Sequence, residues 1–156
     1  MRPLYIFDLD GTLADGSHRV HLIQNEPKRW DEYFEACDGD KPIESVIEIA
    51  NILRKSGADI WIYSGRSDLV RDKTHAWLAE YMAREIALDL VVFPHTLKMR
   101  PYADHRPDDE LKELWLNEMA SEDRKRLVAV FDDRDRVVAM WRRHGVRCLQ
   151  VAAGDF

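Results

Sequence analysis

Asp8 and Asp10 are the residues whose types and spacing could perform chemistry most directly. They follow the apolar run Leu4–Phe7, which predicts a strand buried on both faces, so the acids lie at its carboxyl end. Side chains alternate along a strand with a period of two, so the pair would share one side unless the turn at Gly11 rotates Asp10 away. Open α/β sheets bind ligands at the carboxyl ends of their strands. Two carboxylates in one small pocket repel each other, so the site needs a cation or one acid must hold a proton.

Asp132 and Asp133 repeat this arrangement near the end of the chain. They follow the apolar run Leu127–Phe131, which predicts another buried strand. The carboxyl ends of two parallel strands can meet at one edge of a sheet. The sequence therefore predicts up to four acids at one candidate site.

Polar and basic residues elsewhere could bind an anion at the same edge. The segment Ser64–Arg66 follows the apolar run Ile60–Tyr63, and a helix is expected to begin near Ser67. A hydroxyl, the backbone amides of a glycine turn and the start of a helix would form a seat for an anion. A plain capped turn would have the same sequence. Lys112 lies in a helix that is expected to open at Pro107, and taken alone it would be a solvated side chain.

Strands alternate with helices along the sequence, which indicates a parallel sheet with right-handed crossovers. The expected fold is α/β, a Rossmann-like three-layer sandwich with a mainly parallel five-stranded sheet. The patterns predict strands over residues 4–7, 60–63, 90–93, 127–131 and 148–151, and helices over residues 43–56, 67–82, from 107 onward and 137–145.

Residues 14–41 are polar and irregular and form a lid-like insertion in this prediction. Two short helices are expected in it, over residues 18–24 and 28–36. Arg19 could clamp phosphate oxygens, although a solvated helix face would also fit. A second irregular stretch, residues 94–107, is rich in basic residues. It is the best candidate for a substrate-facing loop, with a merely solvated loop as the alternative.

The composition fits one domain that covers residues 1–156. A hydrophobic content of 46% allows a real core, and a formal net charge of -6 argues against a generally basic nucleic-acid binder while leaving room for a local basic groove. Cys37 and Cys148 form neither a metal-binding nor a redox motif. No apolar run reaches the length of a membrane span and the first residues lack a signal-peptide layout, so we expect a cytoplasmic protein without membrane contact.

The motifs, taken in chain order, resemble the four signature motifs of the haloacid dehalogenase (HAD) phosphatase superfamily. These motifs are Asp8-x-Asp10-Gly11-Thr12, Ser64-Gly65-Arg66, Lys112 and Asp132-Asp133. Residues 132–156, residues 108–112 and the position of Arg19 further resemble the 3'-phosphatase domains of phage polynucleotide kinase/phosphatases. The resemblance spans nearly the whole chain and implies a HAD fold with a minimal cap. Residues 20–41 and 94–106 match least.

The resemblance implies a Mg²⁺-dependent phosphomonoesterase that works through an aspartyl-phosphate. Asp8 would be the nucleophile, and Asp10 would be the general acid and base, with its pKa raised by the crowding of neighbouring acids. The metal would lie between Asp8, the backbone carbonyl of Asp10 and Asp132 or Asp133. The phosphate and substrate contacts are expected from Gly11, Thr12, Arg19, Ser64, Gly65, Arg66, Asp108 and Lys112.

The resemblance favours a terminal 3'-phosphate on a DNA or RNA end as substrate, with Lys98 and Arg100 among the contacts to the strand. The aromatic residues Trp30, Tyr33 and Phe34 could instead close over one base, which would indicate a nucleotide monophosphatase. A phosphate-binding module without activity is a third interpretation, but it would be expected to lack an essential acid. In a receiver domain the lysine follows the acids, whereas here it precedes the second pair. A kinase would need a Gly-x-x-x-x-Gly-Lys-Ser/Thr loop, which the sequence lacks.

Overall fold

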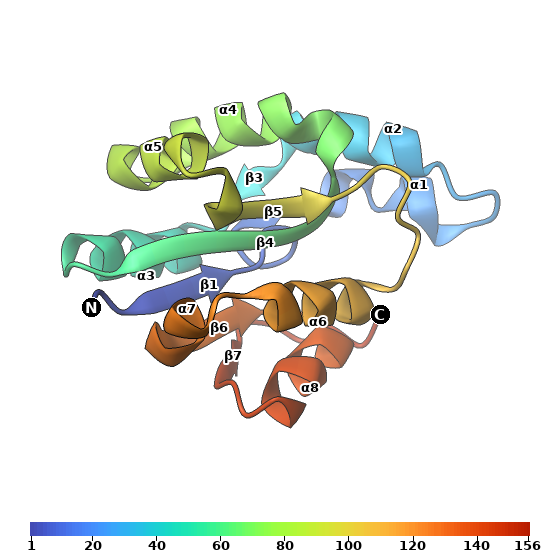
Figure 1. The fold of residues 1–156 in the computed structure, drawn as a ribbon. Coiled ribbons are helices and arrows are strands. Elements are labelled where there is room, and N and C mark those ends of the chain that lie inside the picture. Colours follow the sequence, from blue (N-terminus) through green and yellow to red (C-terminus); the bar gives the residue numbers. More distant parts are fainter.

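A five-stranded parallel sheet lies at the centre of the fold (Figure 1). The computed structural model describes residues 1–156. The strand order is β5-β4-β1-β6-β7, and every neighbouring pair is parallel. The strands are β1 (Leu4–Phe7), β4 (Asp59–Ser67), β5 (Leu97–Arg100), β6 (Leu127–Asp132) and β7 (Cys148–Gln150). The predicted α/β fold is confirmed, and the two strands that carry the acid pairs lie side by side.

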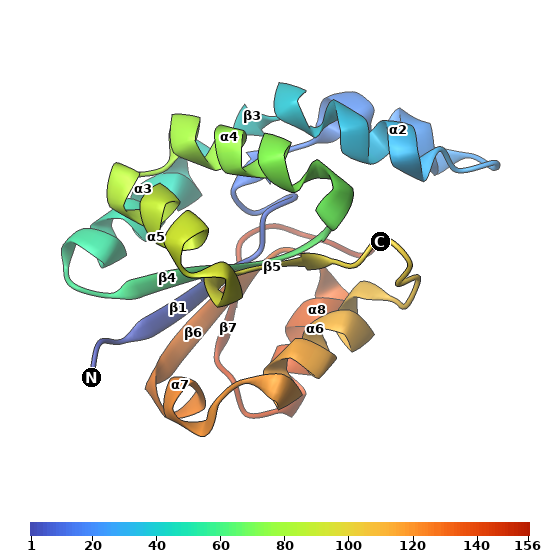
Figure 2. The ribbon, with the colours of Figure 1, turned by 45° about the horizontal axis from the view of Figure 1, so that its top comes forward.

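Helices cover both faces of the sheet, which confirms the three-layer sandwich (Figure 2). Helices α3, α4 and α5 lie over one face, and α6 and α8 lie over the other. Their bounds are α3 (Glu44–Lys55), α4 (Arg71–Tyr81), α5 (Arg84–Val92), α6 (Asp108–Glu118) and α8 (Asp135–Arg143). No helix combines the length and the apolar composition that crossing a membrane requires.

Strand β1 contributes to both layers of the core because its side chains alternate. Leu4 and Ile6 pack in the cluster beneath α6 and α8, whereas Tyr5 and Phe7 pack in the cluster beneath the other helices. The ring of Phe7 stacks on that of Phe131 in β6, with 4.3 Å between the ring centroids. These two residues are also partners in the register of the sheet. The packing therefore fixes the ends of β1 and β6 relative to each other.

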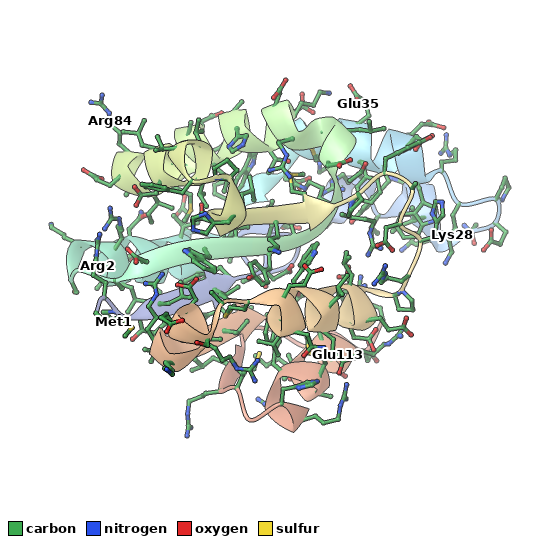
Figure 3. The ribbon with its side chains drawn as sticks, in the orientation of Figure 1. Met1, Arg2, Lys28, Glu35, Arg84 and Glu113 are labelled. Carbon is green, nitrogen blue, oxygen red and sulfur yellow. The ribbon has the colours of Figure 1, made fainter.

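The insertion is closed at its base by a small antiparallel sheet. Strand β2 (Ala14–Asp15) pairs with β3 (Lys41–Pro42), so the two ends of the insertion lie side by side. Between them are η1 (Ser17–Arg19), α1 (His21–Gln24), α2 (Trp30–Glu35) and η2 (Ala36–Gly39). These pieces extend past the carboxyl ends of β4 and β5, with Lys28 in the outer loop (Figure 3). The insertion is thus placed at the edge of the sheet where the acids lie.

The strand predicted over residues 90–93 is wrong, because this apolar run belongs mainly to helix α5. Ile86 and Leu90 are buried one turn apart, whereas Val91 and Val92 are exposed, as expected for a helix with one buried face. The edge strand is β5, further along the chain, where burial alternates with a period of two. Basic residues at its less buried positions concealed this alternation in the sequence.

The glycine turn predicted at Gly65 is also wrong. Strand β4 continues through Ser67, whose Oγ accepts a hydrogen bond from the backbone N–H of Leu69 at 3.3 Å. The helix predicted over residues 67–82 begins later, at Arg71, so Leu69 precedes it and is 67% exposed. The short helices that connect the larger elements are η3 (Asp68–Val70), η4 (Pro94–Thr96) and α7 (Ser121–Arg126).

Replacing Ile6 by alanine should lower the free energy of unfolding by about 2–5 kcal/mol, because this side chain is fully buried in the central strand. Ile52→Ala makes the same change on α3 at a position that is 56% exposed, and it should alter stability by at most about 0.5 kcal/mol. Urea unfolding followed by circular dichroism measures both values. Equal losses in the two variants would contradict this assignment of the core.

Candidate active site

Three buried carboxylates meet where β1 and β6 end. Asp8 follows β1, Asp132 is the last residue of β6, and Asp133 comes next. One oxygen from each lies within 4.8 Å of the others, and all three residues are buried. The backbone N–H of Asp8 donates to the carbonyl oxygen of Phe131 at 2.8 Å, which ties the two strand ends together. Three of the four acids in the two motifs are therefore close neighbours.

Lys112 places a positive charge inside this cluster. Its side chain projects from α6, is 1% exposed, and donates from Nζ to Asp8 Oδ1 at 2.7 Å and to Asp132 Oδ2 at 2.8 Å. Burial lowers the pKa of Lys112, but the two carboxylates outweigh burial, so the pKa is raised overall. The lysine is thus a fixed, charged member of the cluster and not a solvated side chain.

One lysine does not balance three buried carboxylates. Burial raises the pKa of Asp8 well above its usual range, Lys112 opposes this change, and Asp132 and Asp133 add to it. Burial and the neighbouring Asp132 also raise the pKa of Asp133. A group of carboxylate oxygens with excess negative charge suits a hard divalent cation such as Mg²⁺. The three acids therefore fit a metal site.

Asp10 points away from this cluster and toward two arginines. Its Oδ1 accepts from Arg19 Nη2 at 2.7 Å and from Arg66 Nη2 at 2.6 Å. Burial acts to raise the pKa of Asp10, but Arg66 and Arg19 outweigh it and lower the pKa to about 2. The expected raised pKa is wrong, because guanidinium groups and not carboxylates contact this side chain. The Asp10 carboxylate also lies outside the three-acid group.

Asp40 belongs to this second cluster, and the sequence analysis missed it. Its side chain is fully buried and accepts from Arg19 Nε at 2.7 Å, from Arg19 Nη2 at 2.6 Å and from Arg66 Nη2 at 2.9 Å. Two guanidinium groups therefore lie between two carboxylates. No motif surrounds position 40, which is an ordinary acid in a polar insertion. Only its contacts with residues distant in the sequence distinguish it.

Two predicted substrate-binding glycines make room for acids of the site. Gly11 has a φ of +86°, and a Cβ there would lie 2.2 Å from Asp133 Oδ2. A Cβ at Gly65 would lie 2.1 Å from Asp108 Oδ1. Any side chain at either position would collide with a carboxylate. The two glycines thus let Asp133 and Asp108 pack directly against the backbone.

Two predicted hydroxyl residues are buried among the polar groups of the site. Thr12 Oγ1 lies 3.5 Å from Asp8 Oδ2 and 3.4 Å from Asp133 Oδ1, so it faces the three-acid group. Ser64 Oγ accepts from the backbone N–H of Arg66 at 3.1 Å. Ser64 therefore braces the segment that carries the arginine.

The basic stretch does not offer Lys98 and Arg100 to a nucleic-acid strand as expected. Both lie in β5, and Lys98 Nζ is 3.5 Å from a carboxylate oxygen of Glu118. Arg100 donates to Asp108 Oδ1 at 2.8 Å and to the carbonyl oxygen of Gly65 at 2.9 Å. Two further bonds run from Arg100 to the backbone carbonyls of residues 104 and 106. These four bonds hold the loop after β5 against the end of β4.

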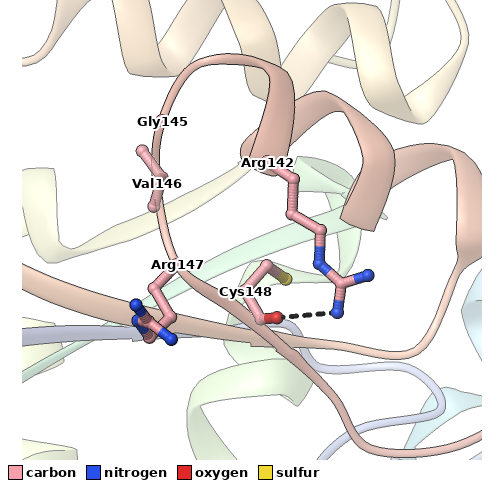
Figure 4. Close-up of a pocket in the computed structure, with 5 residues that line it drawn as sticks. All are labelled: Arg142, Gly145, Val146, Arg147 and Cys148. Atoms are coloured by element: carbon pink, nitrogen blue, oxygen red, sulfur yellow. Dashed lines mark hydrogen bonds between the residues drawn. The ribbon is translucent and has the colours of Figure 1, made fainter.

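A hollow of about 400 Å³ lies at the other end of the sheet and contains none of these residues. It is lined by the segment between α8 and β7, with Arg142 donating to the carbonyl oxygen of Cys148 at 3.0 Å (Figure 4). This segment precedes β7, whereas the acids follow β1 and end β6. Because these strands are parallel, the hollow lies at the amino ends of the strands and the acids lie at their carboxyl ends.

Comparison with solved structures shows similarity to phosphatases and to a chain of an RNA repair assembly. The protein is 29% identical to a chain in the structure of the Pnkp1/Rnl/Hen1 RNA repair complex, with a TM-score of 0.74. The match covers 99% of this protein but only 44% of that chain. The class C acid phosphatase from Bacillus anthracis with tungstate bound matches 99% of this chain and 68% of its own at 16% identity and a TM-score of 0.64.

CbbY from Rhodobacter sphaeroides in complex with phosphate matches 100% of this chain and 88% of its own, at 13% identity and a TM-score of 0.57. These last two likenesses confirm the HAD fold alone. The family model for the polynucleotide kinase PNKP phosphatase domain matches residues 2–156, nearly the whole sequence. The three-acid group and the buried Lys112 agree with this match. The chain therefore belongs to the HAD-type phosphatase domains of the polynucleotide kinase PNKP family.

Proposed function

We propose that this domain is a Mg²⁺-dependent phosphomonoesterase that removes terminal 3'-phosphates from DNA or RNA ends through an aspartyl-phosphate. The observation that carries the chemistry is the buried Asp8 carboxylate, held by Lys112 beside two further acids. The family match supports a polynucleotide end as substrate. The similarity to a chain of an RNA repair complex makes RNA ends a substrate to test beside DNA.

In this proposal Asp8 is the nucleophile. One of its carboxylate oxygens forms a bond to phosphorus while the bond from phosphorus to the nucleoside oxygen breaks. The leaving oxygen takes a proton from Asp10, and Asp10 later removes a proton from the water that hydrolyses the aspartyl-phosphate. Lys112 keeps Asp8 oriented and neutralises part of its charge. Both steps use groups within the two clusters described above.

Asp10 must first gain a proton, because its two arginine partners keep it ionised. The phosphoryl oxygens of a substrate would compete with Asp10 for the donors of Arg19 and Arg66. Loss of these partners would remove the cause of the lowered pKa, and burial would then raise it. Substrate binding would thereby convert Asp10 into an acid at the moment when the leaving group needs one.

The metal would be held by Asp8, Asp132, Asp133 and the backbone carbonyl of Asp10. When bound, Mg²⁺ would screen the anionic nucleophile from the anionic substrate and stabilise charge on the transferred group. Thr12 would support the metal-binding acids through its contacts with Asp8 and Asp133. Gly11 and Gly65 would allow Asp133 and Asp108 to pack closely against the backbone.

The phosphoryl oxygens would be held by Arg19, Arg66 and Lys112, because a loose transition state for phosphoryl transfer needs fixed positive charge around it. Ser64 would contribute by bracing Arg66. Asp108 would act through the arginines that it contacts, because Arg100 Nη2 donates to its Oδ1 at 2.8 Å and Arg134 Nη1 lies 3.5 Å from its Oδ2.

The insertion would select the substrate by contacting its base. The ring of Tyr33 packs against Arg19, with 4.1 Å between the ring centroid and Arg19 Cζ, and Trp30 lies beyond it with 5.8 Å between the two ring centroids. Trp30 is 45% exposed and is therefore free to stack on a base. This observation also favours a second candidate function, a nucleotide monophosphatase that closes over one nucleoside.

Asp8→Asn should abolish phosphate release, because an amide cannot form the aspartyl-phosphate. The assay measures phosphate released with Mg²⁺ from 3'-phosphorylated DNA and RNA oligonucleotides, a 5'-phosphorylated oligonucleotide and free nucleoside monophosphates. Asp109→Asn is the matched control, since Asp109 is on α6 and accepts from Arg136 at 2.9 Å outside the site. It should retain full activity.

The same assay separates the two candidate functions. Preference for the 3'-phosphorylated strands would support end repair, whereas preference for free nucleotides would contradict the polynucleotide substrate and leave the chemistry intact. Activity in Asp8→Asn equal to that of the control would contradict the mechanism itself.

Removal of divalent metal by EDTA should stop the reaction, and added Mg²⁺ should restore it. Mg²⁺ should also raise the unfolding temperature, because it binds only the folded cluster. Asp133→Asn should lose this shift while remaining at least as stable as the parent without metal, since the substitution relieves repulsion with Asp132. Differential scanning calorimetry measures each shift. A full Mg²⁺-dependent shift in Asp133→Asn would show that the cation binds elsewhere.

Trp30→Ala should raise the KM for nucleotide substrates about 10-fold, as expected from the loss of one stacked base. The inhibition constant of inorganic phosphate, which has no aromatic ring to stack, should not change. Phe93→Ala is the matched control, because Phe93 is similarly exposed (48%) but lies at the end of α5, outside the insertion. Equal KM values for nucleotides in the parent and Trp30→Ala would remove this residue from substrate binding.

A further inference from the structure

Asp10 belongs to a ring of four alternating charges, whose other members are Arg19, Asp40 and Arg66. Arg19 Nη2 donates to Asp10 Oδ1 and Asp40 Oδ2 at 2.7 and 2.6 Å, and Arg66 Nη2 donates to the same two oxygens at 2.6 and 2.9 Å. The side chains of Asp40 and of both arginines are at most 1% exposed. Two positive and two negative groups make the ring neutral, so it persists in a nearly dry environment.

Asp40 holds each arginine through contacts that do not involve Asp10. Arg19 engages both Asp40 oxygens, because its Nε donates to Oδ1 at 2.7 Å in addition to the bond from Nη2. Arg66 bonds Asp40 through Nη2 and also donates from Nη1 to Thr74 Oγ1 at 3.2 Å. A phosphoryl group could therefore take the donors that face Asp10 while both guanidinium groups stay in place.

Asp40 is itself fixed by the insertion and by α4. Its backbone N–H donates to the carbonyl oxygen of Cys37 at 3.2 Å, and its own carbonyl accepts from Trp77 Nε1 at 2.8 Å. His18 Nε2 lies 2.9 Å from its Oδ1. The location of the arginine pair is therefore set jointly by the base of the insertion and by the helical layer above the sheet.

We propose that Asp40 is a positioning residue that holds Arg19 and Arg66 while the substrate displaces Asp10 from them. The two guanidinium groups then keep their positions and bind the phosphoryl oxygens through the donors that face Asp10 in the free protein. The inference rests on the phosphatase mechanism proposed above. It predicts that loss of Asp40 weakens phosphate binding while the three-acid group keeps its Mg²⁺ binding.

Inorganic phosphate distinguishes this role from a merely structural one, because it can bind the arginines without any leaving group. Asp40→Asn replaces one acceptor oxygen by an amide group that cannot accept from the arginines. Its inhibition constant for inorganic phosphate and its KM for p-nitrophenyl phosphate should both rise about 10-fold. Mg²⁺ should raise its unfolding temperature as much as in the parent, because the three-acid group is untouched.

Asp40→Glu provides a second variant that keeps the buried charge balanced and so protects the fold. Its longer side chain displaces the arginines, and it should show the same weakening of phosphate binding. Asp38→Asn is the control, because the Asp38 side chain is 62% exposed and outside the ring, and it should change neither constant.

An unchanged inhibition constant for phosphate in both Asp40 variants would overturn the proposed role, and so would loss of the Mg²⁺-dependent shift together with phosphate binding. A parent protein that binds phosphate but hydrolyses no phosphomonoester would instead overturn the proposed function. The two failures are therefore distinguishable.

Discussion

The structure depends on one constraint, which is that three mutually repelling carboxylates are buried together where β1 and β6 end. Lys112 bonds two of them, Asp8 and Asp132, and so offsets only part of the charge. Breaking such a buried pair leaves an uncompensated charge and is strongly destabilising. The stacked Phe7 and Phe131 rings and the missing side chain at Gly11 are arrangements that keep these acids in place. The unbalanced charge is also what makes the cluster a fit for a divalent cation.

The ring of Asp10, Asp40, Arg19 and Arg66 shifts the pKa of Asp10 in the direction opposite to that of Asp8. Asp8 and Asp10 are separated by one residue, yet burial and neighbouring acids raise the pKa of Asp8, whereas two arginines lower that of Asp10 despite its burial. Environments that push the pKa values of paired acids apart are a common basis for assigning them different catalytic roles. In the proposed mechanism this separation of pKa values changes when a substrate occupies the arginines. The insertion contributes to this control because it supplies Arg19 and Asp40.

The sequence was sufficient for the elements with the strongest patterns. Continuous apolar runs identified β1 and β6, because strands buried on both faces need no alternation. The run at residues 90–93 misled us, since an apolar stretch at the end of a helix looks the same as a buried strand until its length and period are considered. Strand β5 was missed because its less buried positions are basic, and we expected the same residues to contact the substrate.

The candidate site was predictable where chemistry and strand position coincide, and not where it depends on tertiary contacts. Asp132 and Lys112 follow from motif order, but Asp40 has no local signal, and its partners lie on a 3-10 helix and a strand. The lowering of the Asp10 pKa could not be foreseen, because a sequence does not show which way a side chain turns at the end of a strand.

The most direct test of the account is to quench the reaction of a ³²P-labelled 3'-phosphorylated oligonucleotide with acid within the first turnover and locate the label on the protein. The account predicts a covalent phosphate on the peptide that contains Asp8, stable in acid and removed by hydroxylamine, and absent from Asp8→Asn. Complete turnover with no label on Asp8 at any time would contradict it and would indicate direct attack by water.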